Sequence, residues 1–156
     1  MVLLAKLANY LIWANDSIWE IIKDLSDEEF RRPMYKSGGS LYARYVHLAE
    51  DTCEWFHDWN SETVDEPDFL GMNRDELYSF ISKYVRKWIG MINEREVDEF
   101  QDERAGKVLK LQFDEMFFHM VNHFTYHRGQ IVMALKILGK EVTMTDYVPH
   151  RFSVIK

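Results

Sequence analysis

The chain has 156 residues, of which 47% are hydrophobic and 29% charged, so it holds enough apolar material for the core of one domain over residues 1–156. Acidic residues outnumber basic ones by 26 to 19, and the formal net charge of -7 argues against a nucleic-acid partner. The one cysteine, Cys53, cannot form an intrachain disulfide, and no uncharged apolar run approaches the roughly 20 residues that cross a bilayer. We therefore predict a folded, cytoplasmic protein with no membrane segment.

The first 60 residues carry two helical patterns. Apolar residues recur at alternating steps of three and four over residues 4–25, which predicts an amphipathic helix. Ser26 followed by Glu29 matches a capping box and predicts a short turn of helix beyond it. The same apolar spacing predicts a second long helix over residues 40–60, and the polar stretch 61–68 is typical of a loop.

A third amphipathic helix is predicted after residue 73. Asn73 and Glu76 form another capping-box pattern, and the apolar spacing that follows reaches Met91. We expect this helix to fray near residues 94–96.

The last third of the chain is less regular at its start. Residues 97–113 have short apolar flanks around a polar centre, and they predict either an irregular loop or a small hairpin. A fourth long helix is predicted over residues 113–138, with Gly139 as its stop. Four long helices with connections of moderate length predict an all-α fold, a four-helix bundle.

Three histidines, His119, His123 and His127, lie at steps of four on this last helix. His119 and His127 differ by about 80° in direction and by about 12 Å along the axis, so they cannot share one ion. At most two neighbours can therefore serve one metal. Because His127 lies within the edge of the apolar face and His119 lies farthest from it, the pair His123 and His127 is favoured.

The spacing of that pair leaves two interpretations open. Two histidines four residues apart can both reach one ion, as in zinc-binding HExxH helices, but no glutamate lies between them here. Two partly buried histidines with ordinary hydrogen-bond partners would give the same pattern.

A third ligand would have to come from another helix, and the candidates are His47 and His57. Helical periodicity places His47 nearly opposite the apolar arc of its helix, so the pattern alone indicates a solvated side chain. His47 and Asp51 lie one turn apart, which would let the carboxylate orient the imidazole or accept a proton.

Four segments of the chain resemble the DinB/YfiT-like family in order and spacing. They are YLIWAN (10–15), VHLAEDTCEW (46–55), NHFTYHRGQI (122–131) and LGKEVTMTDYV (138–148), of which NHxxYHRGQ is the most specific. The resemblance covers nearly the whole chain. It implies a four-helix bundle that binds a divalent metal through three histidines and leaves coordination positions for water or substrate.

Carried over residue by residue, the resemblance implies that the metal ligands are His47, His123 and His127. It overrides the solvated interpretation of His47 and places the ion in a polar cleft at the bundle surface. His119, His57 and His150 match no ligand position and are expected to be ordinary histidines.

Three neutral imidazoles with open positions suit one divalent transition metal ion per chain, zinc or nickel first and then iron, cobalt or manganese. The favoured function is metal-dependent transfer of a low-molecular-weight thiol to a small-molecule substrate, because thiol-dependent relatives in this superfamily do so. The alternatives are a metal-dependent hydrolase, with Asp51 or Glu50 as the candidate proton acceptor, and a non-enzymatic, stress-related metal-binding or regulatory protein. The resemblance also implies a homodimer.

Three other residues near these motifs have competing interpretations. Arg128 is expected to form an inter-helix ion pair or a cap rather than to clamp a substrate. Gln130 could hydrogen-bond near the histidines or be a plain structural amide. Cys53 lies on the apolar side of its helix, which favours a buried, inert thiol.

Overall fold

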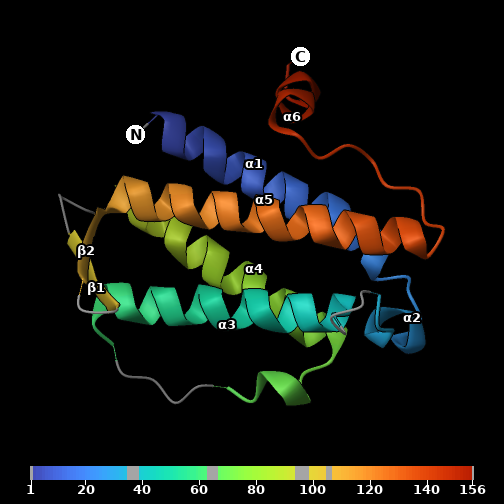
Figure 1. Cartoon of the computed structure of the whole chain (residues 1–156). Coiled ribbons are helices and arrows are strands. Elements are labelled where there is room, and N and C mark those ends of the chain that lie inside the picture. The colour runs from blue at the N-terminus through green and yellow to red at the C-terminus, as the bar shows by residue number, and fades with distance from the viewer. Residues whose placement is uncertain (1, 35–38, 63–66, 94–98, 105–106, 156) are drawn as a thin grey trace.

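The computed structural model describes residues 2–34, 39–62, 67–93, 99–104 and 107–155 of the chain (Figure 1). Within these residues the long helices are α1 (Val2–Ile22), α3 (Leu41–Asn60), α4 (Arg74–Gly90) and α5 (Phe113–Ile137). The shorter elements are α2 (Asp27–Arg31), α6 (Tyr147–Ser153) and the 3-10 turns η1 (Phe69–Gly71) and η2 (Met91–Asn93). The expected all-α fold and its long helices are confirmed.

The helices begin where side chains satisfy their first backbone N–H groups. Ser26 and Glu29 form the predicted capping box at α2, and Asn73 and Glu76 form the second one at α4. The Ser40 hydroxyl accepts from the backbone N–H of Ala43 at the start of α3. Each cap pairs a donor that the helix itself leaves unpaired.

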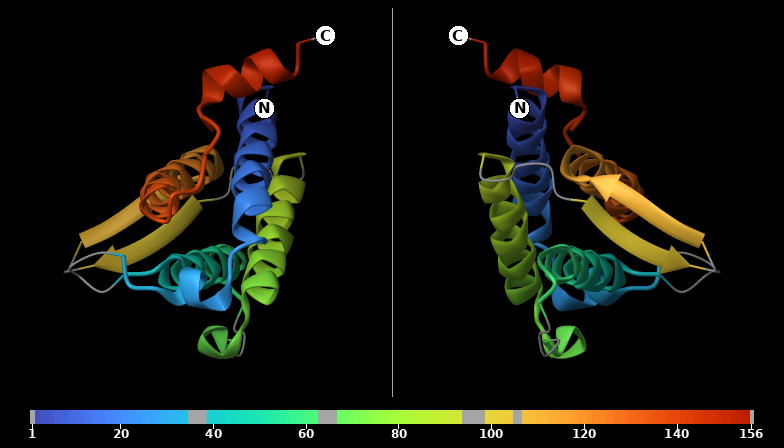
Figure 2. Two further views of the ribbon diagram at one scale, coloured as in Figure 1. Left: turned by 90° about the vertical axis from the view of Figure 1, so that its right-hand side faces the viewer. Right: turned by 90° about the vertical axis from the view of Figure 1, so that its left-hand side faces the viewer.

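The long helices form a closed ring in which α1 packs against α4 and α5, and α3 packs against the same two helices. In Figure 2, α3 and α5 are seen close to end-on, and α1 and α4 lie together on one flank of that pair. The core enclosed by these four helices holds fully buried side chains, among them Leu11, Leu41, Trp88 and Phe117. This arrangement leaves the seam between α3 and α5 on the outer side of the bundle.

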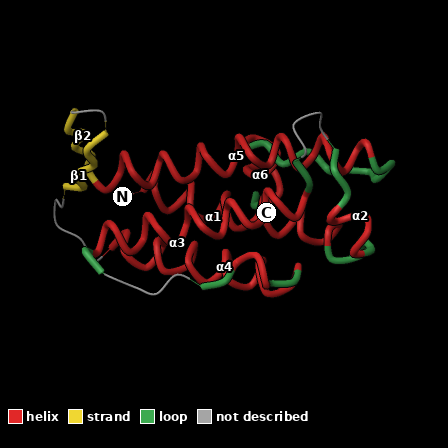
Figure 3. Tube along the Cα trace, turned by 60° about the horizontal axis from the view of Figure 1, so that its bottom comes forward, coloured by secondary structure: helices red, strands yellow, loops and turns green. Residues whose placement is uncertain are grey.

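The segment before α5 is the small hairpin that was one of two predicted possibilities. Strand β1 (Glu99–Arg104) pairs antiparallel with β2 (Lys107–Gln112), with residue 99 opposite 112 and residue 104 opposite 107. Figure 3 shows this hairpin at the end of the bundle where α5 begins. The predicted fraying near residues 94–96 lies outside the described residues.

Helix α6 was not predicted from the sequence. It packs on α1, where the His150 ring lies 5.1 Å from the Trp13 ring and 5.9 Å from the Tyr10 ring, measured between centroids. His150 is only 2% exposed, which makes it a packing residue. No described helix offers a stretch both long and apolar enough to cross a membrane.

Candidate metal centre

The seam between α3 and α5 brings three histidines together. His47 comes from α3, and His123 and His127 come from successive turns of α5. One ring nitrogen from each lies within 4.8 Å of the other two, and these histidines could hold a metal ion. Residues far apart in sequence thus meet because α3 packs directly on α5.

The distances within this histidine triad suit coordination of one ion. The Nε2 atoms of His47 and His127 are 3.1 Å apart. Two nitrogens that each lie about 2.0–2.1 Å from one ion, at an angle of roughly 90–110°, are separated by about 3 Å. The ring of His123 completes the group, with its centroid 5.3 Å from that of His47 and 4.3 Å from that of His127.

The Nε2 atom of His123 tests whether these residues fit a metal ion. It is buried and forms no hydrogen bond of acceptable geometry with any residue that the structure describes. An Asp51 carboxylate oxygen lies 2.9 Å away, but the direction of the nitrogen does not satisfy a hydrogen bond to it. A buried ring nitrogen without a hydrogen bond is costly unless it coordinates an ion, so the donor set fits a metal.

Gln130 settles the orientation of His127. Its Oε1 atom accepts from Nδ1 of His127 at 3.0 Å, which leaves the lone pair of Nε2 directed toward the other two histidines. Of the two interpretations of Gln130, the structure supports the one in which the amide acts near the site. Such a hydrogen bond fixes the tautomer and ring orientation that a ligand histidine needs.

His127 is held neutral by its surroundings. Its pKa is lowered from 6.5 to about 4, mainly by burial and next by the neighbouring charge of His123, while the hydrogen bond that it donates to Gln130 acts in the opposite direction. His47 and Arg44 also contribute to the lowering. A neutral imidazole is the form that binds a metal, so this histidine needs no proton removed at neutral pH.

Asp51 and Glu50, the two candidate proton acceptors, occupy different environments. The Asp51 carboxylate is 18% exposed and lies 3.4 Å from Nε2 of His47 and 2.9 Å from Nε2 of His123. Glu50 is exposed, and no ion pair or hydrogen bond joins it to a described residue. Of these two candidates, Asp51 is therefore the one that lies beside the histidine triad.

The other histidines lie where they were expected, outside the triad. His119 is exposed, and its ring packs on Trp55. The nitrogens of His57 contact Glu62 and the Tyr84 hydroxyl, each at 2.9 Å. The ring of Trp55, which the sequence did not single out, also packs against His123, with centroids 4.9 Å apart. Its position one turn beyond Asp51 on α3 was the available signal.

The structure also tests the predictions for Cys53 and Arg128. Cys53 is buried at 4% exposure, as expected for an inert thiol. Arg128 does join two helices, but it bonds the Tyr10 hydroxyl of α1, and no described carboxylate forms an ion pair with it. The expected inter-helix ion pair is therefore replaced by a hydrogen bond.

The fold and the histidine triad define an all-α bundle with a candidate metal centre at one helix seam. A sequence model of the DinB family matches residues 1–153, and the chain belongs to that family. It is similar to Protein DinB of Bacillus subtilis (strain 168), with 24% identity over 155 aligned positions, and the alignment covers 91% of this chain and 90% of that protein.

Proposed function

We propose that this DinB-family protein is a metal-dependent enzyme whose ion is held by His47, His123 and His127. The observation that carries the proposal is the convergence of three ring nitrogens, one of them buried without a hydrogen bond in the described structure. Zinc and nickel suit three imidazoles best, followed by iron, cobalt and manganese. When bound, such an ion supplies a Lewis acid that lowers the pKa of a water molecule or a thiol.

The role that we assign to Asp51 is proton transfer. Its carboxylate lies beside two of the triad nitrogens and is only partly exposed, so it can accept a proton from a nucleophile at the same place. Gln130 holds His127 in the ligand tautomer, and Trp55 forms an aromatic wall against His123. Glu50 has no comparable contact, and we assign it no role.

Transfer of a low-molecular-weight thiol is the reaction that we favour, because of the resemblance to thiol-dependent relatives. In this reaction the thiol gives its proton to Asp51, and its sulfur forms a bond to an electrophilic carbon of the second substrate. The leaving group departs from that carbon with the bonding electrons. Hydrolysis is the alternative, and it would use the same histidines and the same carboxylate with water as the nucleophile.

The first test is elemental analysis of protein purified without a histidine tag. About one transition metal ion per chain is expected, and it should be lost when His47, His123 or His127 is replaced by alanine. The matched control is His119→Ala, which changes a histidine of the same helix outside the triad. Equal loss of metal from His119→Ala would show that the wrong histidines have been chosen.

The second test separates an enzyme from a binding protein. Asp51→Asn should keep the metal and lose turnover of thiol with an electrophile, because the amide cannot accept the proton. Turnover of esters or amides without consumption of thiol would favour hydrolysis. Metal that raises the melting temperature without any turnover would support a non-enzymatic, regulatory role.

A further inference from the structure

A phenol, an imidazole and a carboxylate form a chain of hydrogen bonds where α3 ends beside α4. The hydroxyl oxygen of Tyr84 lies 2.9 Å from Nε2 of His57, and Nδ1 of His57 lies 2.9 Å from a carboxylate oxygen of Glu62. A carboxylate oxygen accepts and does not donate, so Nδ1 carries the ring hydrogen and Nε2 accepts the hydrogen of the phenol. The phenol proton therefore has a positioned base within hydrogen-bond reach.

The end of α3 places Glu62 beside His57. Ser61 adopts the left-handed conformation with a φ of 53°, which turns the chain back on the helix. The backbone N–H of Glu62 then donates to the backbone oxygen of His57 at 2.9 Å. The His57 side chain is 12% exposed and that of Glu62 is 52% exposed, so the chain of hydrogen bonds runs from the core to the surface.

The surroundings of Tyr84 oppose a charge of either sign on its phenol. The residue is 6% exposed, and burial first, then a hydrogen bond with Cys53, raises its pKa to about 12. The Lys87 ammonium lies 4.5 Å from the centroid of the ring. Loss of an electron alone would put a positive charge beside this ammonium, and loss of a proton alone would bury a phenolate. Loss of both together leaves the ring neutral.

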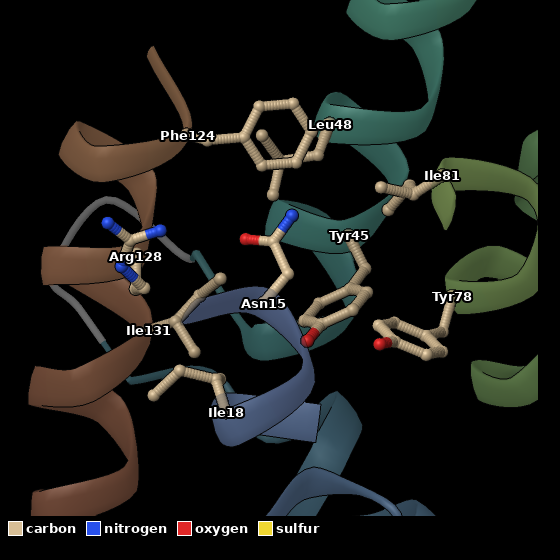
Figure 4. A pocket seen from close by; sticks show the side chains of 9 residues that line it. All are labelled: Asn15, Ile18, Tyr45, Leu48, Tyr78, Ile81, Phe124, Arg128 and Ile131. Carbon is tan, nitrogen blue, oxygen red and sulfur yellow. The ribbon is translucent and has the colours of Figure 1, made fainter. Parts of the chain in front are cut away.

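The other buried aromatic side chains that the structure describes have weaker proton acceptors. The Tyr10 hydroxyl and the Trp88 indole each donate to a backbone carbonyl oxygen. Tyr45 lies in the wall of a small internal cavity (Figure 4), and its hydroxyl forms no hydrogen bond with a described residue. Tyr78, in the same wall, donates to the carboxylate of Asp16, which is a weaker base than an imidazole.

Aromatic rings connect Tyr84 with the tryptophans of the core. The ring of Phe56 lies between them, with its centroid 5.5 Å from that of Tyr84 and 6.0 Å from that of Trp88. The Trp59 ring lies 6.0 Å beyond Trp88. Rings at these separations are in contact, so an electron can pass from one to the next. An oxidising equivalent on any of these rings is therefore expected to move to the ring that can release its proton to an imidazole.

We propose that Tyr84 is a one-electron redox site, with His57 as its proton acceptor and Glu62 as the residue that orients His57. A one-electron oxidant, such as an oxidised tryptophan ring of the same core, takes one electron from the Tyr84 phenol. The phenol proton moves to Nε2 of His57, which leaves a neutral phenoxyl radical and an imidazolium that the Glu62 carboxylate stabilises. Return of one electron reverses both transfers. Because these residues lie between α3 and α4, the proposal stands whether or not the histidine triad binds metal.

Light-driven oxidation by a ruthenium complex with an electron acceptor is the first measurement. The protein holds zinc or no metal, because zinc has no redox chemistry of its own. The wild type should give the absorption and electron paramagnetic resonance signals of a persistent neutral phenoxyl radical, which forms more slowly in heavy water. Tyr84→Phe should lose this radical, whereas Tyr78→Phe and Tyr126→Phe, the latter changing an exposed tyrosine, should keep it. A radical that persists in Tyr84→Phe would overturn the proposal.

The second measurement separates a proton acceptor from a neighbour that only packs against the phenol. The amide of His57→Gln can accept a hydrogen bond but is not a base, so the radical should form roughly 100-fold more slowly. The matched control is His119→Gln, which changes an exposed histidine and should leave the rate unchanged. An unchanged rate in His57→Gln would overturn the role of His57 and the proposal with it.

A third measurement uses the wild type and applies even if Tyr84→Phe fails to fold. Protein whose histidines carry a heavy nitrogen isotope is oxidised in the same way and examined by electron–nuclear double resonance. The phenoxyl radical should show magnetic coupling to an imidazole nitrogen and to the proton bound to it. A radical without this coupling lies on another tyrosine, and that result would contradict the proposal.

Discussion

Gln130 lies three residues after His127 and accepts a hydrogen bond from its Nδ1 atom. We predict that Gln130→Ala keeps the fold but lowers metal affinity roughly 10- to 100-fold, because the ring of His127 loses the contact that fixes its tautomer and orientation. Competition with a chromophoric chelator measures this change.

The control for that prediction is Asn122→Ala, which removes an exposed amide from the same helix and should leave the affinity unchanged. An unchanged affinity in Gln130→Ala would mean that the amide is only structural, which was the competing interpretation of the sequence.

His47 shows what helical periodicity can and cannot predict about a single residue. The pattern alone indicated a solvated side chain, and the side chain is indeed 38% exposed. Its Nε2 atom nevertheless lies 3.1 Å from that of His127, because the polar edge of α3 faces α5 across their seam. The periodicity of α3 does not show which neighbouring helix covers its polar edge. Only the family resemblance therefore selected His47.

At the scale of elements, the long helices were predictable because each carries an apolar stripe, and each predicted capping box is present. Helix α6 was not predictable, because it has only seven residues, too few for an apolar stripe to repeat, and one of them is Pro149. The hairpin was predicted only as one of two possibilities. Its residues 107–110 are exposed, so they carry no alternation between a buried and a solvated face.

One tyrosine joins two of these helices to the segment before α6. The Tyr10 hydroxyl of α1 accepts from Arg128 of α5 and donates to the backbone oxygen of Thr145, just before α6. We predict that Tyr10→Phe lowers the free energy of unfolding by about 1–3 kcal/mol, because it leaves both buried partners without that hydrogen bond. Urea unfolding monitored by tryptophan fluorescence measures the loss.

The matched control is Tyr126→Phe, which removes a hydroxyl from a tyrosine that is 64% exposed. It should change the free energy of unfolding by no more than about 0.5 kcal/mol. If the two variants lost the same amount, the Tyr10 hydroxyl would not be what ties α1, α5 and the segment before α6 together.

At the scale of the whole molecule, His127 links stability to pH in the metal-free protein. Its folded pKa is lowered to about 4, against 6.5 for an ordinary histidine. Between these values the unfolded chain binds a proton that the folded protein does not, so lowering the pH favours unfolding. The stabilising contribution is fully present above about pH 6.5 and is lost as the pH falls toward 4.

We therefore predict that the urea concentration at the unfolding midpoint of the metal-free wild type decreases as the pH is lowered from 6.5 to about 4. This decrease should be smaller in His127→Gln. His119→Gln, which changes an exposed histidine of the same helix, should leave the slope as it is. A slope that survives in His127→Gln would show that other groups dominate acid unfolding.

The bond from Tyr10 to Thr145 spans 135 positions of the chain, so it closes almost the whole polypeptide into one loop. The segment that carries Thr145 can reach Tyr10 only after α1 has packed on α5, so we expect this bond to form late in folding and to open early under native conditions. The amides of α6 should then exchange with deuterium well before those in the middle of α5. The carboxyl-terminal segment would then detach from α1 before the bundle unfolds, and its detachment would not require the bundle to unfold.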